Sequence, residues 1–125
     1  MVARFDALTD AITKKHKEAS LLAFLKMDDN PDTWTMIYSS PEVKETEEGK
    51  EYRRNLFKEF AELLRESEKS IAYKSSEINR VGIFQLDNHI VIDALKYKAG
   101  THITELTKMN GNMISEGFIT ISKSA

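Results

Sequence analysis

The stretch GIFQLDNHIVIDAL, residues 82–95, is the densest apolar segment of the chain, and the predicted fold depends on it. Two β-rich runs, residues 78–86 and 89–97, flank the pair Asp87-Asn88. Asp and Asn tolerate the positive φ angles that two-residue hairpin turns require. We therefore predict an antiparallel β-hairpin whose two faces are both largely apolar. A sheet with one face in water would instead alternate apolar and polar residues.

Two apolar faces of a sheet need two covers. We expect helices of the same chain on one face, and another strand layer or a second subunit on the other. We favour a homodimer formed through this sheet or its edge, and a further protein partner is possible. The expected interface residues are Trp34, Tyr38, Ile83, Ile90 and Ile92.

The N-terminal part of the chain predicts a helix followed by a hairpin. Apolar residues spaced three and four apart predict an amphipathic helix over residues 2–17. Residues 20–27 are uniformly apolar, the turn formers of residues 28–32 follow, and residues 33–39 alternate. These features favour a β-hairpin, although residues 20–27 are also compatible with a continuation of the first helix.

A second helix and further strands are predicted downstream. Ser39 and Pro41 fit a helix start, and the apolar stripe over residues 52–64 is the clearest helical pattern of the chain. The charged residues 42–51 contain Gly49, so they form either a loop or a frayed first turn.

The tail leaves one choice open. Residues 101–109 fit either a strand or a short helix. Asn110-Gly111 is a hairpin turn signal, and residues 117–122 alternate like a closing strand.

This order, helix-strand-strand-helix-strand-strand-strand, predicts an α+β fold. Its simplest form is a single antiparallel β-sheet built of hairpins, with two amphipathic helices packed on it. The chain has 125 residues, the usual length of one domain, and it shows no linker or internal repeat. We therefore expect residues 1–125 to form a single α+β domain.

Polar residues set into the predicted hairpin are candidate ligand-binding residues. In the register of a two-residue turn, Asp93 lies diagonally from Arg80, within reach of an ion pair. In a polar pocket on the sheet, Arg80 would fix an anionic ligand and Asp93 or His89 would move a proton, with His102 completing the pocket. A structural ion pair beside a turn histidine explains the same residues and is the more common cause. A small-molecule-binding protein or small enzyme is therefore the alternative function.

Composition excludes several classes of site. The chain has 18 Lys plus Arg and 20 Asp plus Glu, interleaved to a formal net charge of -2, so no nucleic-acid partner is expected. A stacking platform of Trp34 and Tyr38 is the weaker RNA-binding alternative. The pair Arg53-Arg54 lies among glutamates and predicts a solvated charged face.

Motifs for chemistry are equally scarce. The chain has no cysteine, which excludes disulfides and thiolate catalysis, and its three histidines lack a helical ligand spacing. Glycine-rich phosphate loops and serine nucleophile elbows are absent. We expect no metal and no other cofactor, and the question of enzymatic activity stays open.

No apolar run approaches the roughly 20 residues of a membrane span, and the N-terminal segment lacks an apolar signal core. These observations predict no membrane partner and a cytoplasmic location. The function that they favour is a small, non-enzymatic, homodimeric interaction or regulatory module.

Overall fold

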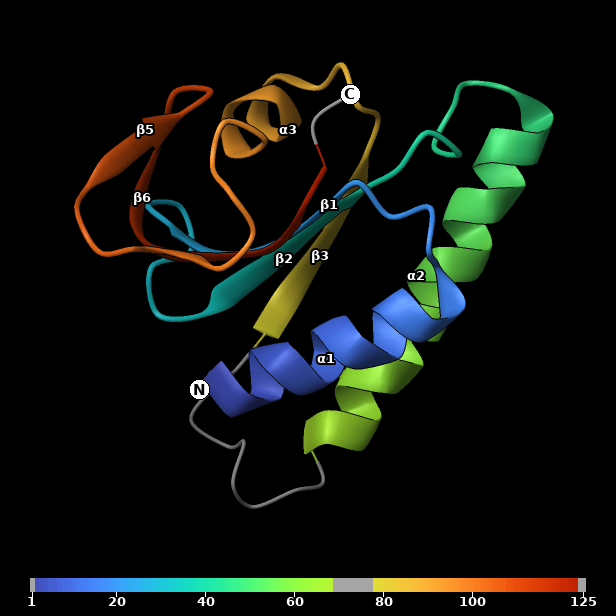
Figure 1. Ribbon diagram of the computed structural model, residues 1–125, viewed down its shortest axis with the longest axis horizontal. Coiled ribbons are helices and arrows are strands. Elements are labelled where there is room, and N and C mark those ends of the chain that lie inside the picture. Colours follow the sequence, from blue (N-terminus) through green and yellow to red (C-terminus); the bar gives the residue numbers. More distant parts are fainter. Residues whose placement is uncertain (1, 69–77, 124–125) are drawn as a thin grey trace.

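A computed structural model describes residues 2–68 and 78–123. The described residues form three helices and a six-stranded mixed sheet, in which the strands follow the path β3-β2-β1-β6-β4 and β5 pairs with β6 beside it (Figure 1). The predicted α+β class is confirmed, but the purely antiparallel sheet is wrong because β2 and β3 run parallel. The elements are α1 (Val2–Lys15), β1 (Leu21–Met27), β2 (Trp34–Ser39), α2 (Glu47–Glu68), β3 (Ile78–Phe84), α3 (His89–Ala94), β4 (Thr101–Ile103), β5 (Thr107–Met109) and β6 (Asn112–Ser122).

Strand β1 is the centre of the sheet. It pairs antiparallel with β2 on one side and with β6 on the other, so the predicted N-terminal hairpin is confirmed. Residues 20–27, which are compatible in sequence with helix or strand, therefore belong to the strand. All five residues from Leu21 to Leu25 are 0% exposed. The segment is apolar at every position because both faces of β1 are covered.

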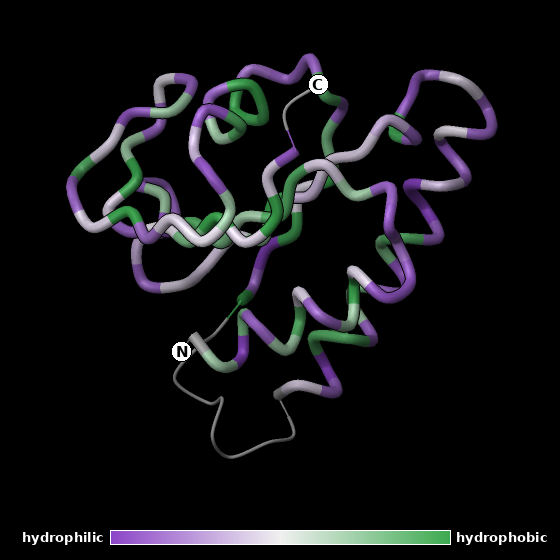
Figure 2. Tube along the Cα trace, viewed as in Figure 1, coloured by the Kyte–Doolittle hydropathy of each residue, from purple (hydrophilic) through white to green (hydrophobic). Residues whose placement is uncertain are grey.

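Each face of the sheet has its own hydrophobic core (Figures 1 and 2). On one face, α1 and α2 cover alternate strand residues such as Phe24 and Tyr38. The Phe5 ring of α1 stacks on Phe24 with centroids 4.2 Å apart. On the opposite face, α3, β4 and β5 pack over residues such as Leu25 and Ile37. The second cover thus comes from the same chain.

The hairpin predicted around Asp87-Asn88 is wrong, because the second run forms α3 and not a strand. The Asn88 side chain caps this helix by accepting a hydrogen bond from the backbone N–H of Ile90 at 3.0 Å. Ile90, Val91 and Ala94 then fall on one helical face and are buried. A short apolar run is compatible with both the two-residue period of a strand and the 3.6-residue period of a helix. Here the Asn88 cap favours the helix.

Strand β3 instead pairs parallel with β2, and α2 makes the crossover that a parallel pair requires. Polar contacts fasten its first residues to the turn between β1 and β2. The Arg80 guanidinium binds both carboxylate oxygens of Asp29, at 3.1 and 2.9 Å. The Asn79 side-chain oxygen accepts hydrogen bonds from Asn30 and Thr33. These contacts hold an edge strand in register.

Helix α2 begins at Glu47, later than the predicted start. Ser39 does not cap it, because Ser39 is the last residue of β2 and its hydroxyl donates to the Phe84 carbonyl at 2.6 Å. The Thr46 hydroxyl accepts from the Gly49 N–H at 3.0 Å, which is an N-cap bond. The charged residues before Glu47 are therefore loop.

The tail consists of strands, as one of the two alternatives predicted. Residues 101–109 contain β4 and β5, and both pair antiparallel with β6. The turn signal Asn110-Gly111 is confirmed, since the two residues have φ angles of 48° and 80°. Positive φ at both positions is the requirement of a tight hairpin turn.

Gly49 lets the preceding loop pack against the first turn of α2. A Cβ at this position would lie 2.4 Å from the Lys44 carbonyl oxygen. We expect Gly49→Ala to lower the free energy of unfolding by about 1–3 kcal/mol, the usual cost of overpacking, although alanine favours helices. Urea denaturation measures the change, with the exposed neighbour Glu48→Ala as control. Equal stability of Gly49→Ala and the unsubstituted protein would contradict this account.

Candidate functional site

The four residues predicted to share a polar pocket are not brought together. Arg80 lies on β3 and His102 on β4, at opposite ends of the strand path. The Arg80 side chain donates to Asp29, to the Thr35 hydroxyl and to the Met27 sulfur. His102 stacks on Phe118 with ring centroids 4.0 Å apart.

Asp93 and His89 lie on α3. The Asp93 carboxylate accepts the Asn110 N–H at 2.8 Å and contacts the Lys96 ammonium at 3.2 Å. These hydrogen bonds, first that of Asn110, hold the pKa of Asp93 below its ordinary value. Asp93 therefore fastens α3 to the turn before β6, and the predicted ion pair with Arg80 is absent from the described contacts. His89 is exposed at the first position of the helix.

The residues predicted for an interface are mostly interior. Trp34, Tyr38 and Ile83 are at most 1% exposed under α1 and α2, and Ile90 is 5% exposed in the second core. Helices cover Trp34 and Tyr38, so these rings offer no open platform for an RNA base. Ile92 is 42% exposed and is the one member of the set available at the surface.

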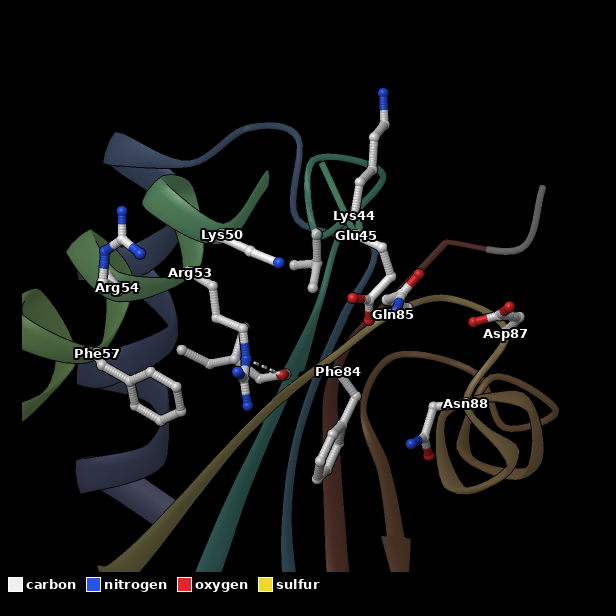
Figure 3. Close-up of a pocket in the computed structure, with 12 residues that line it drawn as sticks. Lys44, Glu45, Lys50, Arg53, Arg54, Phe57, Phe84, Gln85, Asp87 and Asn88 are labelled. Carbon is white, nitrogen blue, oxygen red and sulfur yellow. Dashed lines mark hydrogen bonds between the residues drawn. The ribbon is translucent and has the colours of Figure 1, made fainter. Parts of the chain in front are cut away.

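A cleft of about 550 Å³ lies between the first half of α2 and the end of β3 (Figure 3). Helix α2 contributes Lys50, Arg53 and Phe57, and β3 contributes Ile83 and Phe84. Loop residues complete the lining, before α2 on one side and after β3 on the other. The full lining is Val43, Lys44, Glu45, Lys50, Arg53, Arg54, Phe57, Ile83, Phe84, Gln85, Asp87 and Asn88.

The charge of this cleft is opposite to that of the whole chain. The lining residues include four cations, Lys44, Lys50, Arg53 and Arg54, and two carboxylates, Glu45 and Asp87, which gives a formal charge of 4 − 2 = +2. The Glu45 carboxylate already accepts a hydrogen bond from Gln85 at 2.6 Å. In Figure 3 the Lys50 and Arg53 side chains reach into the cleft, and Lys44 extends away from it.

Arg53 is held at the border of the cleft. Its Nε donates to the Ile83 carbonyl at 2.9 Å, the dashed line in Figure 3. Its guanidinium lies over the Phe57 ring, 5.1 Å from the centroid. Among the described residues this is the only hydrogen bond of Arg53, so its terminal amino groups are available to an anion.

A second pocket, of about 370 Å³, lies on the other face of β3. It shares Arg53, Phe84 and Asn88 with the cleft, so the two hollows adjoin around this edge of the sheet. Gly82 is in its lining, where a Cβ would lie 2.5 Å from the Phe84 ring. The missing side chain lets Phe84 fold back along its own strand. Ile37 and Ile90 give this pocket an apolar part, while Arg80, Asn110 and Asn112 give it a polar rim.

The cleft was not predicted, because the pair Arg53-Arg54 lies among glutamates in the sequence and such a pattern predicts a solvated charged face. One signal was present, since Lys50, Arg53, Arg54 and Phe57 are spaced three and four apart and so share one face of a helix. The other wall comes from β3, whose place beside α2 follows from long-range pairing. Local sequence gave no indication of that pairing.

A separate polar cluster ties the end of α1 to α2. The His16 ring contacts Glu18 at 3.0 Å and Glu59 at 2.6 Å through its two nitrogens. The Tyr52 hydroxyl donates to Glu18 at 2.7 Å and contacts the Tyr38 hydroxyl at 2.8 Å. Burial by itself would raise the pKa of Glu18, but the hydrogen bonds from Tyr52, the backbone and His16 outweigh it and lower the pKa. These groups satisfy one another, which is typical of a structural cluster.

Comparisons with known proteins give no relative: no protein family, no curated protein and no solved structure matches this chain. Within residues 2–68 and 78–123, no helix is both long and apolar enough to cross a membrane. Over the same residues, no three His, Cys, Asp or Glu side chains gather as a metal site would need.

The polar cluster predicts acid sensitivity. The lowered pKa of Glu18 means that its contribution to stability is complete above the unfolded value of about 4.3 and is lost as pH falls through the folded value. We expect Glu18→Gln to be less stable than the unsubstituted protein at pH 7 and to lose less stability between about pH 5 and pH 3. Urea denaturation across this range measures both.

Glu62→Gln, at an exposed position of α2, is the control for the loss of one charge. A Glu18→Gln variant with the same pH dependence as the unsubstituted protein would contradict the role given to Glu18.

Proposed function

We propose that this protein is a non-enzymatic interaction module that binds an acidic segment of a partner protein in the cleft between α2 and β3. The observation that carries the proposal is the cationic lining, in which Lys50, Arg53 and Arg54 extend from one helix face beside an edge strand. Charge complementarity of this kind steers encounter and selects partners. The half-buried rings of Phe57 and Phe84 add apolar area to the contact.

The chemistry of the lining supports binding. Its described residues include no serine, threonine, cysteine or histidine that could act as a nucleophile or as a histidine base. Glu45 is engaged by Gln85, and Asp87 is exposed on the opposite side. Fixed cations over a mixed polar and apolar floor suit recognition of a carboxylate-bearing chain.

The same charges argue against a second copy of this chain at the cleft. A two-fold axis beside β3 would bring the cations of one copy close to those of the other, at a cost in free energy. The homodimer predicted from the sequence therefore gives way here to an acidic partner. The carboxylates of Glu45 and Asp87 also repel a continuous phosphate backbone. We place the module in the cytoplasm, and its cysteine-free sequence is compatible with reducing conditions.

The test is the binding of a fluorescein-labelled oligoglutamate peptide, followed by fluorescence anisotropy. We expect the double variant Lys50→Glu/Arg54→Glu to weaken binding about tenfold or more, because two attractive charges become repulsive. The matched control is Lys58→Glu/Arg65→Glu, which makes the same charge change at exposed positions of α2 outside the cleft. It should change binding by about twofold at most.

Equal losses in the two double variants would show that only net charge matters and would contradict the cleft as the site. No measurable binding of the peptide would overturn the proposal. A single-stranded oligonucleotide that competes with the peptide and binds more tightly than it does would overturn the choice of a protein partner. Native mass spectrometry of the free protein adds a further test: a dimer abolished by charge reversal in the cleft would assign the site to a second copy.

A further inference from the structure

Among residues 2–68 and 78–123, no strand pairs with the outer edge of β3. Strand β3 ends the strand path and, within the described part of the chain, pairs only with β2. The Phe84 carbonyl faces β2, since it accepts from the Ser39 hydroxyl, whereas the Ile83 carbonyl faces outward to Arg53. Backbone groups of successive strand residues point to opposite sides, so the N–H and C=O of Val81 also face outward. These groups are a template for another strand.

The two hollows lie on opposite sides of this edge. The cleft is on the face covered by α2, and the second pocket is on the face covered by α3. Side chains of a strand added to an edge alternate between the two faces of the sheet. They would therefore enter the cleft and the second pocket in turn, past the shared residues Arg53, Phe84 and Asn88. The other end of the strand path, β4, is three residues long and lacks this pair of pockets.

We infer that the partner segment binds as an added β-strand on the outer edge of β3 and that it alternates acidic and apolar residues. This inference rests on the function proposed above and specifies how the acidic segment is held. Acidic side chains face Lys50 and Arg53 in the cleft, with Arg54 at its border. Apolar side chains enter the second pocket beside Ile37, Ile90 and the Phe84 ring that covers Gly82.

Arg53 has a distinct part in this arrangement. In the free chain its hydrogen bond to the Ile83 carbonyl caps an outward-facing group of the edge, which discourages random strand pairing. A backbone N–H of the incoming strand takes over this carbonyl. The guanidinium then turns to a carboxylate of the segment, so that its hydrogen bond to a carbonyl is replaced by an ion pair.

A labelled peptide of alternating glutamate and valine tests the backbone contacts. In a strand, all its glutamate N–H groups face one side and all its valine N–H groups face the other. We expect N-methylation of one of these two sets to weaken binding about tenfold or more, and N-methylation of the other set to change it by about twofold at most. Equal effects of the two methylated peptides would overturn strand addition.

Val81 gives a matching test on the protein. Val81→Pro removes an outward N–H that makes no bond to β2, a position where an edge strand tolerates proline, and Val81→Thr keeps the N–H and the branched shape. We expect Val81→Pro to bind about tenfold more weakly than Val81→Thr, because only proline removes the N–H, with circular dichroism to check that both variants fold. Hydrogen exchange of the Val81 and Ile83 amides should slow when the peptide binds to the unsubstituted protein.

The outcomes separate the two proposals. Binding that is lost on Lys50→Glu/Arg54→Glu, but is insensitive to both methylations and to Val81→Pro, would overturn strand addition and support acidic recognition by side chains alone. If neither the oligoglutamate peptide nor the glutamate-valine peptide binds, both proposals are overturned. If Val81→Pro does not fold, the two methylated peptides and the amide exchange still decide the question.

Discussion

The burial of β1 on both faces is the constraint on which the rest of this structure depends. Five consecutive residues of β1, from Leu21 to Leu25, have no exposed surface. Each side of the strand therefore needs a hydrophobic cover. Fully burying one leucine or phenylalanine side chain contributes about 1.5–3 kcal/mol, and exposing either face would forfeit several such contributions. Helices α1 and α2 meet this need on one face, and α3 with β4 and β5 meets it on the other.

This arrangement restricts where the protein can bind another molecule. With both faces of the central sheet covered, backbone groups remain available at its edges. The parallel pairing of β3 with β2 places a seven-residue strand at one edge, and the Arg80–Asp29 contact fixes its register there. The crossover that this pairing requires is α2, which brings Lys50, Arg53 and Arg54 alongside β3. The cationic cleft is therefore a consequence of the topology. One wall is the crossover helix α2, and the other wall is β3, the strand that follows it.

Local signals in the sequence predicted the elements whose own residues specify them. The turn formers of residues 28–32 and the pair Asn110-Gly111 located two turns, and the stripe of α2 located the longest helix. The segment from His89 to Ala94 was misassigned because six apolar-rich residues fit either period. This segment is helical because Asn88 caps it and because Ile90 is buried against the sheet.

The candidate site was beyond local signals for a different reason. Arg53 and Ile83 are thirty residues apart, and their hydrogen bond exists because β3 pairs with β2. Sequence spacing places Lys50, Arg53 and Arg54 on one helix face. The spacing does not indicate that β3 lies opposite this face. Arg80 illustrates the same limit. Its predicted partner was Asp93, on the assumption of a hairpin, and its observed partner is Asp29, fifty-one residues away.

In the proposed complex, Arg53 would exchange its hydrogen bond to Ile83 for an ion pair with the partner segment. The hydrogen bond from Arg53 to the Ile83 carbonyl is partly buried, and hydrogen bonds of charged groups contribute about 1.5–3 kcal/mol. A surface ion pair contributes about 0–1 kcal/mol, so exchanging the hydrogen bond for an ion pair would add no free energy of binding. In the proposed complex the affinity would then come from backbone pairing along Val81 and Ile83 and from apolar burial beside Ile37 and Ile90. In the proposed complex, charge in the cleft would chiefly set how fast an acidic segment arrives and which segments are rejected, and salt would screen that effect over about 10 Å. In this proposal the charged side chains of the cleft select the partner, and the backbone and apolar groups at the edge of β3 provide the affinity.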